Sequence, residues 1–216
     1  MRRVVIGVVV LLVLALAGTA AAVKLQPVPG ALALPATSVA PTGVLEGTWT
    51  VGPGSVAGFR ITQTVIALSS DVVGRTTGLT GTATVTTGQV TGADVEVDLR
   101  GLTSGGKPAP QFTKGLDTDR YPTATIRVTR PIPLDPSFTT GATITASAAG
   151  QLTLHGVARP VTVPLQARRS GDTLLVTGRF PVSFADHRIT HPGGIPVLGD
   201  LDDHGVAEFL LVLHRT

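Results

Sequence analysis

The stretch QLTLHGVARPVTVPL, residues 151–165, decides the fold class of this chain. Apolar side chains occupy every second position on both sides of a turn at His155 and Gly156. Alternation with a period of two is typical of β-strands that bury one face. The stretch therefore predicts a β-ribbon whose apolar face carries Leu152, Leu154, Val161, Val163 and Leu165.

The same alternation continues through most of the chain after Gly47. Clusters of Gly, Pro, Asp or Ser separate the alternating segments, as in antiparallel sheets. About eight strands are predicted, the ribbon included, and the others lie near residues 59–62, 79–86, 94–99, 124–128, 143–148, 173–182 and 206–213. Eight antiparallel strands can close into a barrel that is packed with side chains or holds one small ligand. A sandwich of two sheets is the alternative, because alternation alone does not distinguish the two folds.

The residues LTLHGVARPV, numbers 152–161, resemble the signature of the YceI-like family, which comprises secreted or periplasmic β-barrels that hold a polyisoprenoid chain. A second stretch, GLDTDRYPTATI at 115–126, resembles the family segment that enters a strand through a Tyr-Pro pair. The resemblance implies an all-β fold, an antiparallel eight-stranded lipocalin-like barrel, over residues 47–216. Residues 107–110 stand where the family commonly has an Arg-Asp pair, so a head-group preference cannot be carried over.

One short helix is predicted near residues 110–116. Phe112 and Leu116 are four positions apart and would share its apolar face, where they could cap one mouth of the barrel. Pro122 favours an extended Tyr121 and so starts the next strand.

The inward side chains are the candidate ligand-binding residues. If the barrel encloses a cavity, as the resemblance implies, an apolar chain would contact them without much help from hydrogen bonds. The same residues would equally form a solid core, and Trp49 is expected to be a packing plug. The candidates are Phe59, Ile61, Val95, Val97, Phe112, Leu116, Ile126, Leu152, Leu154, Val163, Leu165, Leu174, Val176, Phe180 and Phe209.

The amino terminus predicts export. Arg2 and Arg3 precede an apolar run over residues 4–23, long enough as a helix to cross a bilayer. Residues 1–23 are therefore a signal peptide or a transmembrane anchor, and the length of the run favours the anchor. Residues 24–46 contain four prolines among small residues and predict a flexible linker that holds the domain away from the membrane. Either outcome places the domain outside the cytoplasm, secreted or membrane-anchored.

Composition excludes several function classes. The chain has no Cys, which excludes disulfides, thiolate metal sites and a cysteine nucleophile. Without Arg2 and Arg3, its 15 basic residues nearly balance 14 acidic ones, and aromatics make up only 4%. A nucleic-acid partner is therefore not expected.

No catalytic or metal constellation is expected either. His155 has no nucleophile close by in the sequence, so we expect a turn histidine that hydrogen-bonds to backbone and not a catalytic acid or base. We expect Arg159 to be a turn residue, or else to contact a polar ligand head at the barrel rim. A second polar region lacks the spacing of a known metal site, and we expect a polar rim loop there. Its members are Asp186, His187, His191, Asp200, Asp202, Asp203 and His204.

The resemblance, together with the predicted export segment, thus implies a non-enzymatic extracytoplasmic binding protein for an isoprenoid lipid, a quinone or polyprenyl chain, with the membrane as a second partner. Apart from the bound lipid, no cofactor is expected. The alternative is a structural or interaction module with a filled barrel and no ligand, for example in stress responses. The sequence leaves the oligomeric state open.

Overall fold

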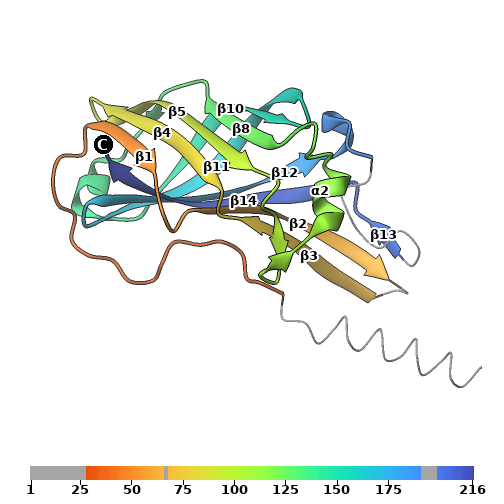
Figure 1. Cartoon of the computed structure of the whole chain (residues 1–216). Helices are drawn as coiled ribbons and strands as arrows, with labels where there is room; N and C mark the ends of the chain where they lie inside the picture. The colour runs from red at the N-terminus through yellow and green to blue at the C-terminus, as the bar shows by residue number, and fades with distance from the viewer. Residues whose placement is uncertain (1–27, 66–67, 191–198) are drawn as a thin grey trace, which may run out of the picture.

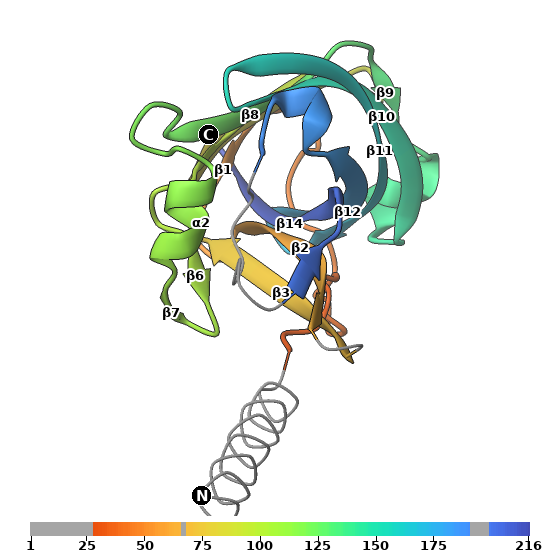
Figure 2. The same cartoon turned by 90° about the vertical axis from the view of Figure 1, so that its right-hand side faces the viewer.

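The computed structural model describes residues 28–65, 68–190 and 199–216, and its centre is a closed antiparallel barrel (Figures 1 and 2). β1 pairs with β14, with Trp49 opposite Arg215, and this pairing closes the ring. The barrel, not the sandwich, is therefore the fold. In order around the ring the strands are β1 (Gly47–Val51), β4 (Leu79–Thr86), β5 (Gln89–Asp98), β8 (Thr123–Val128), β10 (Ile144–Leu154), β11 (Val157–Ser170), β12 (Thr173–Ser183) and β14 (His204–Arg215).

The ribbon predicted from residues 151–165 is the hairpin β10–β11. Leu154 lies opposite Val157, so His155 and Gly156 form a two-residue turn. Both have positive φ, 50° and 71°, which is the combination that tight hairpins need to match strand twist. β10 runs unbroken from Ile144, so the segments predicted at 143–148 and 151–154 are one strand.

A second hairpin, β2 (Val56–Val65) and β3 (Leu68–Thr76), extends the sheet beyond the ring. β14 pairs with β2 along one half and with β1 along the other. The sequence did not predict β3, whose inward positions lack an apolar series. Its Gly74 leaves room for the ring of Phe59, because a Cβ there would lie 2.6 Å from that ring. Four two- or three-residue strands complete the sheet: β6 (Thr103–Ser104), β7 (Lys107–Pro108), β9 (Ile132–Pro133) and β13 (Gly199–Leu201).

Short helices cover the two ends of the barrel. The predicted helix is present as α2 (Pro110–Gly115), and it lies at one mouth together with the 3-10 helix η2 (Ala185–His187) (Figure 2). The 3-10 helix η1 (Pro136–Thr140) brings the buried Phe138 into the core of the opposite end. Trp49 belongs to that core, is 1% exposed and donates from Nε1 to the carbonyl oxygen of Leu45, as expected of a packing plug.

Residues 28–46, which we call the strap, lie along the outside of the barrel (Figure 1). The prolines predicted a flexible spacer over residues 24–46, whereas this part of it is held by hydrogen bonds. Gly171 donates to the carbonyl of Val39 and accepts from the amide of Thr42, and Leu45 is buried. The strap docks because the turn between β11 and β12 and several arginines offer hydrogen-bond partners to its backbone.

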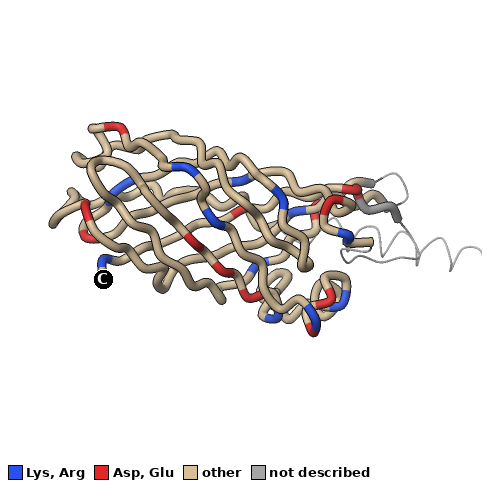
Figure 3. The backbone as a smooth tube through the Cα atoms, turned by 90° about the horizontal axis from the view of Figure 1, so that it is seen from above, with Lys and Arg blue, Asp and Glu red and all other residues tan. Residues whose placement is uncertain are grey.

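Charged residues of both signs are interspersed along the barrel (Figure 3). Exposed pairs such as Arg127 with Asp94 lie on the outer face. Within the described residues, no helix is long and apolar enough to span a membrane. The signal or anchor segment, residues 1–23, and residues 24–27 of the linker fall outside the described part of the chain.

Candidate functional site

The interior of the barrel contains an apolar cavity of about 150 Å³ near α2, which we call cavity 1. Leu116 follows α2, Phe184 and Ile189 flank η2, and all three line the cavity. Glu208 is the only charged residue beside it among the described residues. Its carboxylate accepts from the amide of Leu32 in the strap, so it faces the outside of β14, and the cavity itself is apolar.

A second cavity of about 120 Å³, cavity 2, lies toward η1. Phe138 and Leu213 line its far end, and two small residues of β10, Ala146 and Ala148, line its wall. The small side chains are the reason for the space, because larger residues at the same inward positions would fill it. Engineered apolar cavities of this size stay dry and bind small hydrocarbons.

Four residues line both cavities and form a waist between them: Val95, Ile126, Phe209 and Leu211. The largest is Phe209, which pairs with Gly178 across β14 and β12. A Cβ at Gly178 would lie 2.7 Å from the Phe209 ring and 2.9 Å from Leu165, so glycine is needed for this packing. The lumen therefore holds two apolar compartments that share these four lining residues, of which Phe209 is the largest.

The structure places 14 of the 15 candidate residues around these compartments. Cavity 1 is lined by Phe59, Ile61, Val97, Leu116, Leu152, Leu154 and Phe180, and cavity 2 by Val163, Leu165, Leu174 and Val176, while Val95, Ile126 and Phe209 belong to the waist.

Phe112 is the exception. It is fully buried in α2 and lines neither cavity. Its ring lies edge-on behind Phe59, with centroids 4.9 Å apart, so it supports the lining instead of forming it.

Part of the lining was not predicted from the sequence. Leu79, Val182, Ala207 and Leu211 lie on strands, and the alternation of their segments could have identified them. Phe138 and Ile189 reach the cavities from 3-10 helices and short loops, which carry no periodic signal.

The histidines near the α2 mouth bond to backbone. His155 Nδ1 lies 3.1 Å from the carbonyl oxygen of His187, and its ring packs on Tyr121 at 4.3 Å. His187 is 3% exposed, and its Nδ1 lies 3.1 Å from the carbonyl oxygen of Val157. Arg159 donates to the carbonyl of Asp186. These contacts fasten η2 to the β10–β11 turn and so position Phe184 and Ile189 against cavity 1.

The candidate metal region is dispersed. His191 lies outside the described residues, and of the side chain of Asp200 nothing is described. The other members of this polar region form no group of three side chains that could hold a metal ion, and none occurs elsewhere among the described residues. His204 Nδ1 lies 2.8 Å from Asp203 Oδ1, and this hydrogen bond raises the pKa of His204 and lowers the pKa of Asp203.

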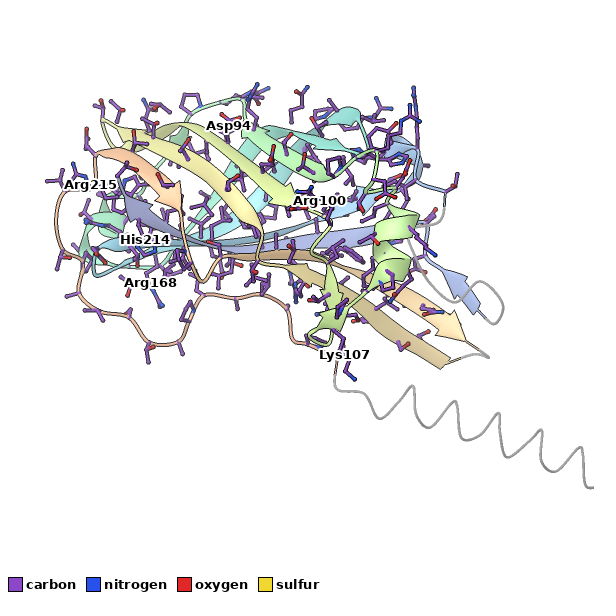
Figure 4. All side chains as sticks on the ribbon, in the orientation of Figure 1. Asp94, Arg100, Lys107, Arg168, His214 and Arg215 are labelled. Carbon is purple, nitrogen blue, oxygen red and sulfur yellow. The ribbon has the colours of Figure 1, made fainter. Side chains whose placement is uncertain are left out.

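Another exposed pair lies where β5 ends. Arg100 donates to both carboxylate oxygens of Asp98, at 3.0 and 2.8 Å, and these hydrogen bonds lower the pKa of Asp98. Arg100 lies on the surface (Figure 4). Both side chains are solvent-accessible, whereas the neighbouring Val97 and Leu99 line cavity 1, so the pair belongs to the outer surface and stabilises the bend after β5.

Comparison with known proteins gives one family. The model of the YceI-like domain matches residues 49–206, whereas no curated protein matches the chain. A solved polyisoprenoid binding domain from Saccharophagus degradans is 17% identical, with a TM-score of 0.60 over 79% of this chain and 99% of that one. BcnA of Burkholderia cenocepacia is 19% identical, with a TM-score of 0.54 over 71% of this chain and 95% of that one. At these identities the two structures establish likeness of fold.

Proposed function

Because this chain belongs to the family of YceI-like domains, we propose that it is a non-enzymatic, extracytoplasmic binding protein that holds an isoprenoid chain in its barrel. The observation that carries the proposal is the pair of apolar compartments inside one closed barrel, both lined by Phe209. A similar fold occurs in a protein described as a polyisoprenoid binding domain. Quinone and polyprenyl chains are the expected ligands, for carriage or sequestration.

The lumen suits a branched hydrocarbon because its affinity would come from burial. Removing about 500 Å² of apolar lipid surface from water contributes about 12 kcal/mol. An association cost of about 4 kcal/mol then leaves a dissociation constant in the micromolar range. The apolar cavities add few polar contacts, so we expect selectivity for the tail to exceed selectivity for the head.

The proposal includes membrane anchoring through residues 1–23. The apolar run over residues 4–23 and the basic pair before it support a retained anchor with the barrel outside the cytoplasm. Secretion after cleavage is the alternative, and the mass of the mature protein from cells distinguishes the two.

A filled structural module is the second candidate function. The small size of each compartment, about 150 and 120 Å³, favours it. In that case the cavities are packing defects and no lipid occupies them.

Native mass spectrometry of the full chain, purified in mild detergent and followed by solvent extraction, separates the two. Carriage predicts about one isoprenoid per chain, or uptake of an added isoprenoid quinone or polyprenyl phosphate. A straight-chain fatty acid is the control for nonspecific uptake. A protein that stays empty and takes up neither isoprenoid would refute the proposal in favour of the filled module.

A further inference from the structure

We propose that the strap holds the α2 end of the barrel at the membrane surface, so that cavity 1 is the compartment nearest the lipid. This inference rests on the proposed function, in which residues 1–23 stay in the bilayer. It concerns the orientation of the barrel, which lipid binding alone does not determine.

The first part of the strap is fixed on a buried ion pair. The side chain of Glu208 is 2% exposed, and its carboxylate lies 2.7 Å from Arg75 Nη1. The amide of Leu32 donates to the same carboxylate at 3.0 Å, and Arg75 donates to the carbonyl of Gly30 at 2.9 Å. Thr177 also donates to the carbonyl of Leu32. A buried charge is costly without hydrogen-bond partners. The strap supplies such partners to Glu208 and Arg75, and these two side chains in turn hold the strap in place.

The second part of the strap is fixed at the turn between β11 and β12. The Arg169 residue is 4% exposed, and its guanidinium donates to the carbonyls of Thr42 and Gly43 at 2.8 and 3.1 Å. Arg168, labelled in Figure 4, donates to the carbonyl of Thr37 at 3.1 Å. Contacts at both ends prevent the strap from acting as a free spacer.

The direction of the strap determines which end of the barrel faces the anchor. It begins beneath β3 and runs from there toward the η1 end of the barrel (Figures 1 and 2). Arg60 donates to the carbonyl of Pro29 at 2.6 Å, which fixes this starting point on β2. Arg60 stands between Phe59 and Ile61, which line cavity 1, so the described part of the strap begins beside that cavity.

The free tether is short once the strap is docked. Residues 24–27 alone separate the apolar run from Val28, and they span at most about 15 Å when extended. A free linker over residues 24–46 would span about 70 Å at 3.1 Å per residue. The docked strap therefore converts a long spacer into a close attachment, and the barrel cannot turn its η1 end to the membrane without undocking it.

Single-cysteine variants of the full chain test the orientation, because the sequence has no other cysteine. Lys107→Cys reports the α2 end and Thr139→Cys, in η1, reports the other. Each carries a coumarin donor, and the protein is reconstituted in phosphatidylcholine vesicles with a minor fraction of phosphatidylglycerol and a rhodamine-labelled lipid acceptor. Strands of this length and tilt put the two ends about 25 Å apart. We expect donor quenching at position 107 to be at least about twofold stronger than at position 139.

The control leaves the strap and the barrel intact. A Gly-Ser segment of about 20 residues, inserted between Gln26 and Pro27, adds a mean span of about 25 Å. The quenching ratio should then fall toward one. Equal quenching in the unmodified chain, an unchanged ratio after insertion, or failure to float with the vesicles overturns the proposal. The isoprenoid content of the same samples is measured separately, so loss of lipid binding with an intact ratio counts against the proposed function alone.

Discussion

Filling cavity 2 should stabilise the ligand-free barrel, and Ala146→Leu tests this directly. Ala146 lines the cavity from β10, and the substitution adds three carbons. Burying them contributes about 2.4 kcal/mol at 0.8 kcal/mol per carbon. Ordering the leucine side chain costs about 0.5–1 kcal/mol. We expect the free energy of unfolding to rise by about 1.5 kcal/mol, which raises Tm by about 3–6 °C for a chain of this size.

The ceiling of this gain follows from the volume of the cavity. An empty apolar cavity costs about 24 cal/mol per Å³, so 120 Å³ corresponds to about 3 kcal/mol. The matched control is Ala149→Leu on the outer face of the same strand, where a change within about 0.5 kcal/mol is expected. Thermal unfolding of delipidated protein, followed by far-ultraviolet circular dichroism, measures both variants.

The same variant should weaken lipid uptake, because a tail that extends past Phe209 loses its space in cavity 2. A loss of 1–3 kcal/mol of stability in Ala146→Leu would refute the reasoning, since overpacking has that cost and would mean that the space is already filled. Stabilisation without any effect on uptake would confine the ligand to cavity 1.

Three further predictions concern the polar groups around the barrel. Glu208→Gln breaks a buried ion pair and should cost about 3 kcal/mol in urea unfolding, whereas Asp94→Asn in an exposed pair should cost less than about 1 kcal/mol. The pKa of Asp98 is lowered by Arg100, so its contribution to stability is present above the pKa of the unfolded chain and is lost as pH falls through the folded value. The urea midpoint of Asp98→Asn should therefore lie below that of the natural chain at pH 7, and the two should converge as pH falls below the folded value; a constant difference would contradict this. His187→Ala leaves the carbonyl of Val157 without its buried partner and should cost about 2 kcal/mol, with faster hydrogen exchange in η2; unchanged exchange there would show that other contacts fasten η2.

Much of the barrel could be predicted because its signals are local. Alternation along 151–165 identified one hairpin, and a spacing of four identified α2. β3 was not predicted, in part because Gly74 occupies an inward position, where the absence of a side chain makes room for the Phe59 ring. Its apolar residues Val72 and Val73 are adjacent, so β3 shows no alternating series that could have revealed it.

Most residues that line the cavities could be predicted from the sequence, but the shape of the cavities could not. Inward positions followed from alternation, yet the division of the lumen depends on how far Phe209 reaches past Gly178, which is a matter of three-dimensional packing. The docking of the strap also could not be predicted from the sequence, because its partners, such as Arg169 and Glu208, lie more than 120 positions away along the chain. Proline-rich composition describes an isolated linker and not a surface that binds it.

The strap continues directly into β1, the strand that closes the ring over only three paired positions beside β14. A mechanical pull from the membrane side would reach the hydrogen bonds at Pro29 first, then those at Leu32, and then those at Thr42, one after another. These hydrogen bonds would break in that order, and the pairing of β1 with β14 would bear the load last. If residues 1–23 anchor the chain as proposed, the strap would take up tension from the bilayer before it reaches the short pairing of β1 with β14.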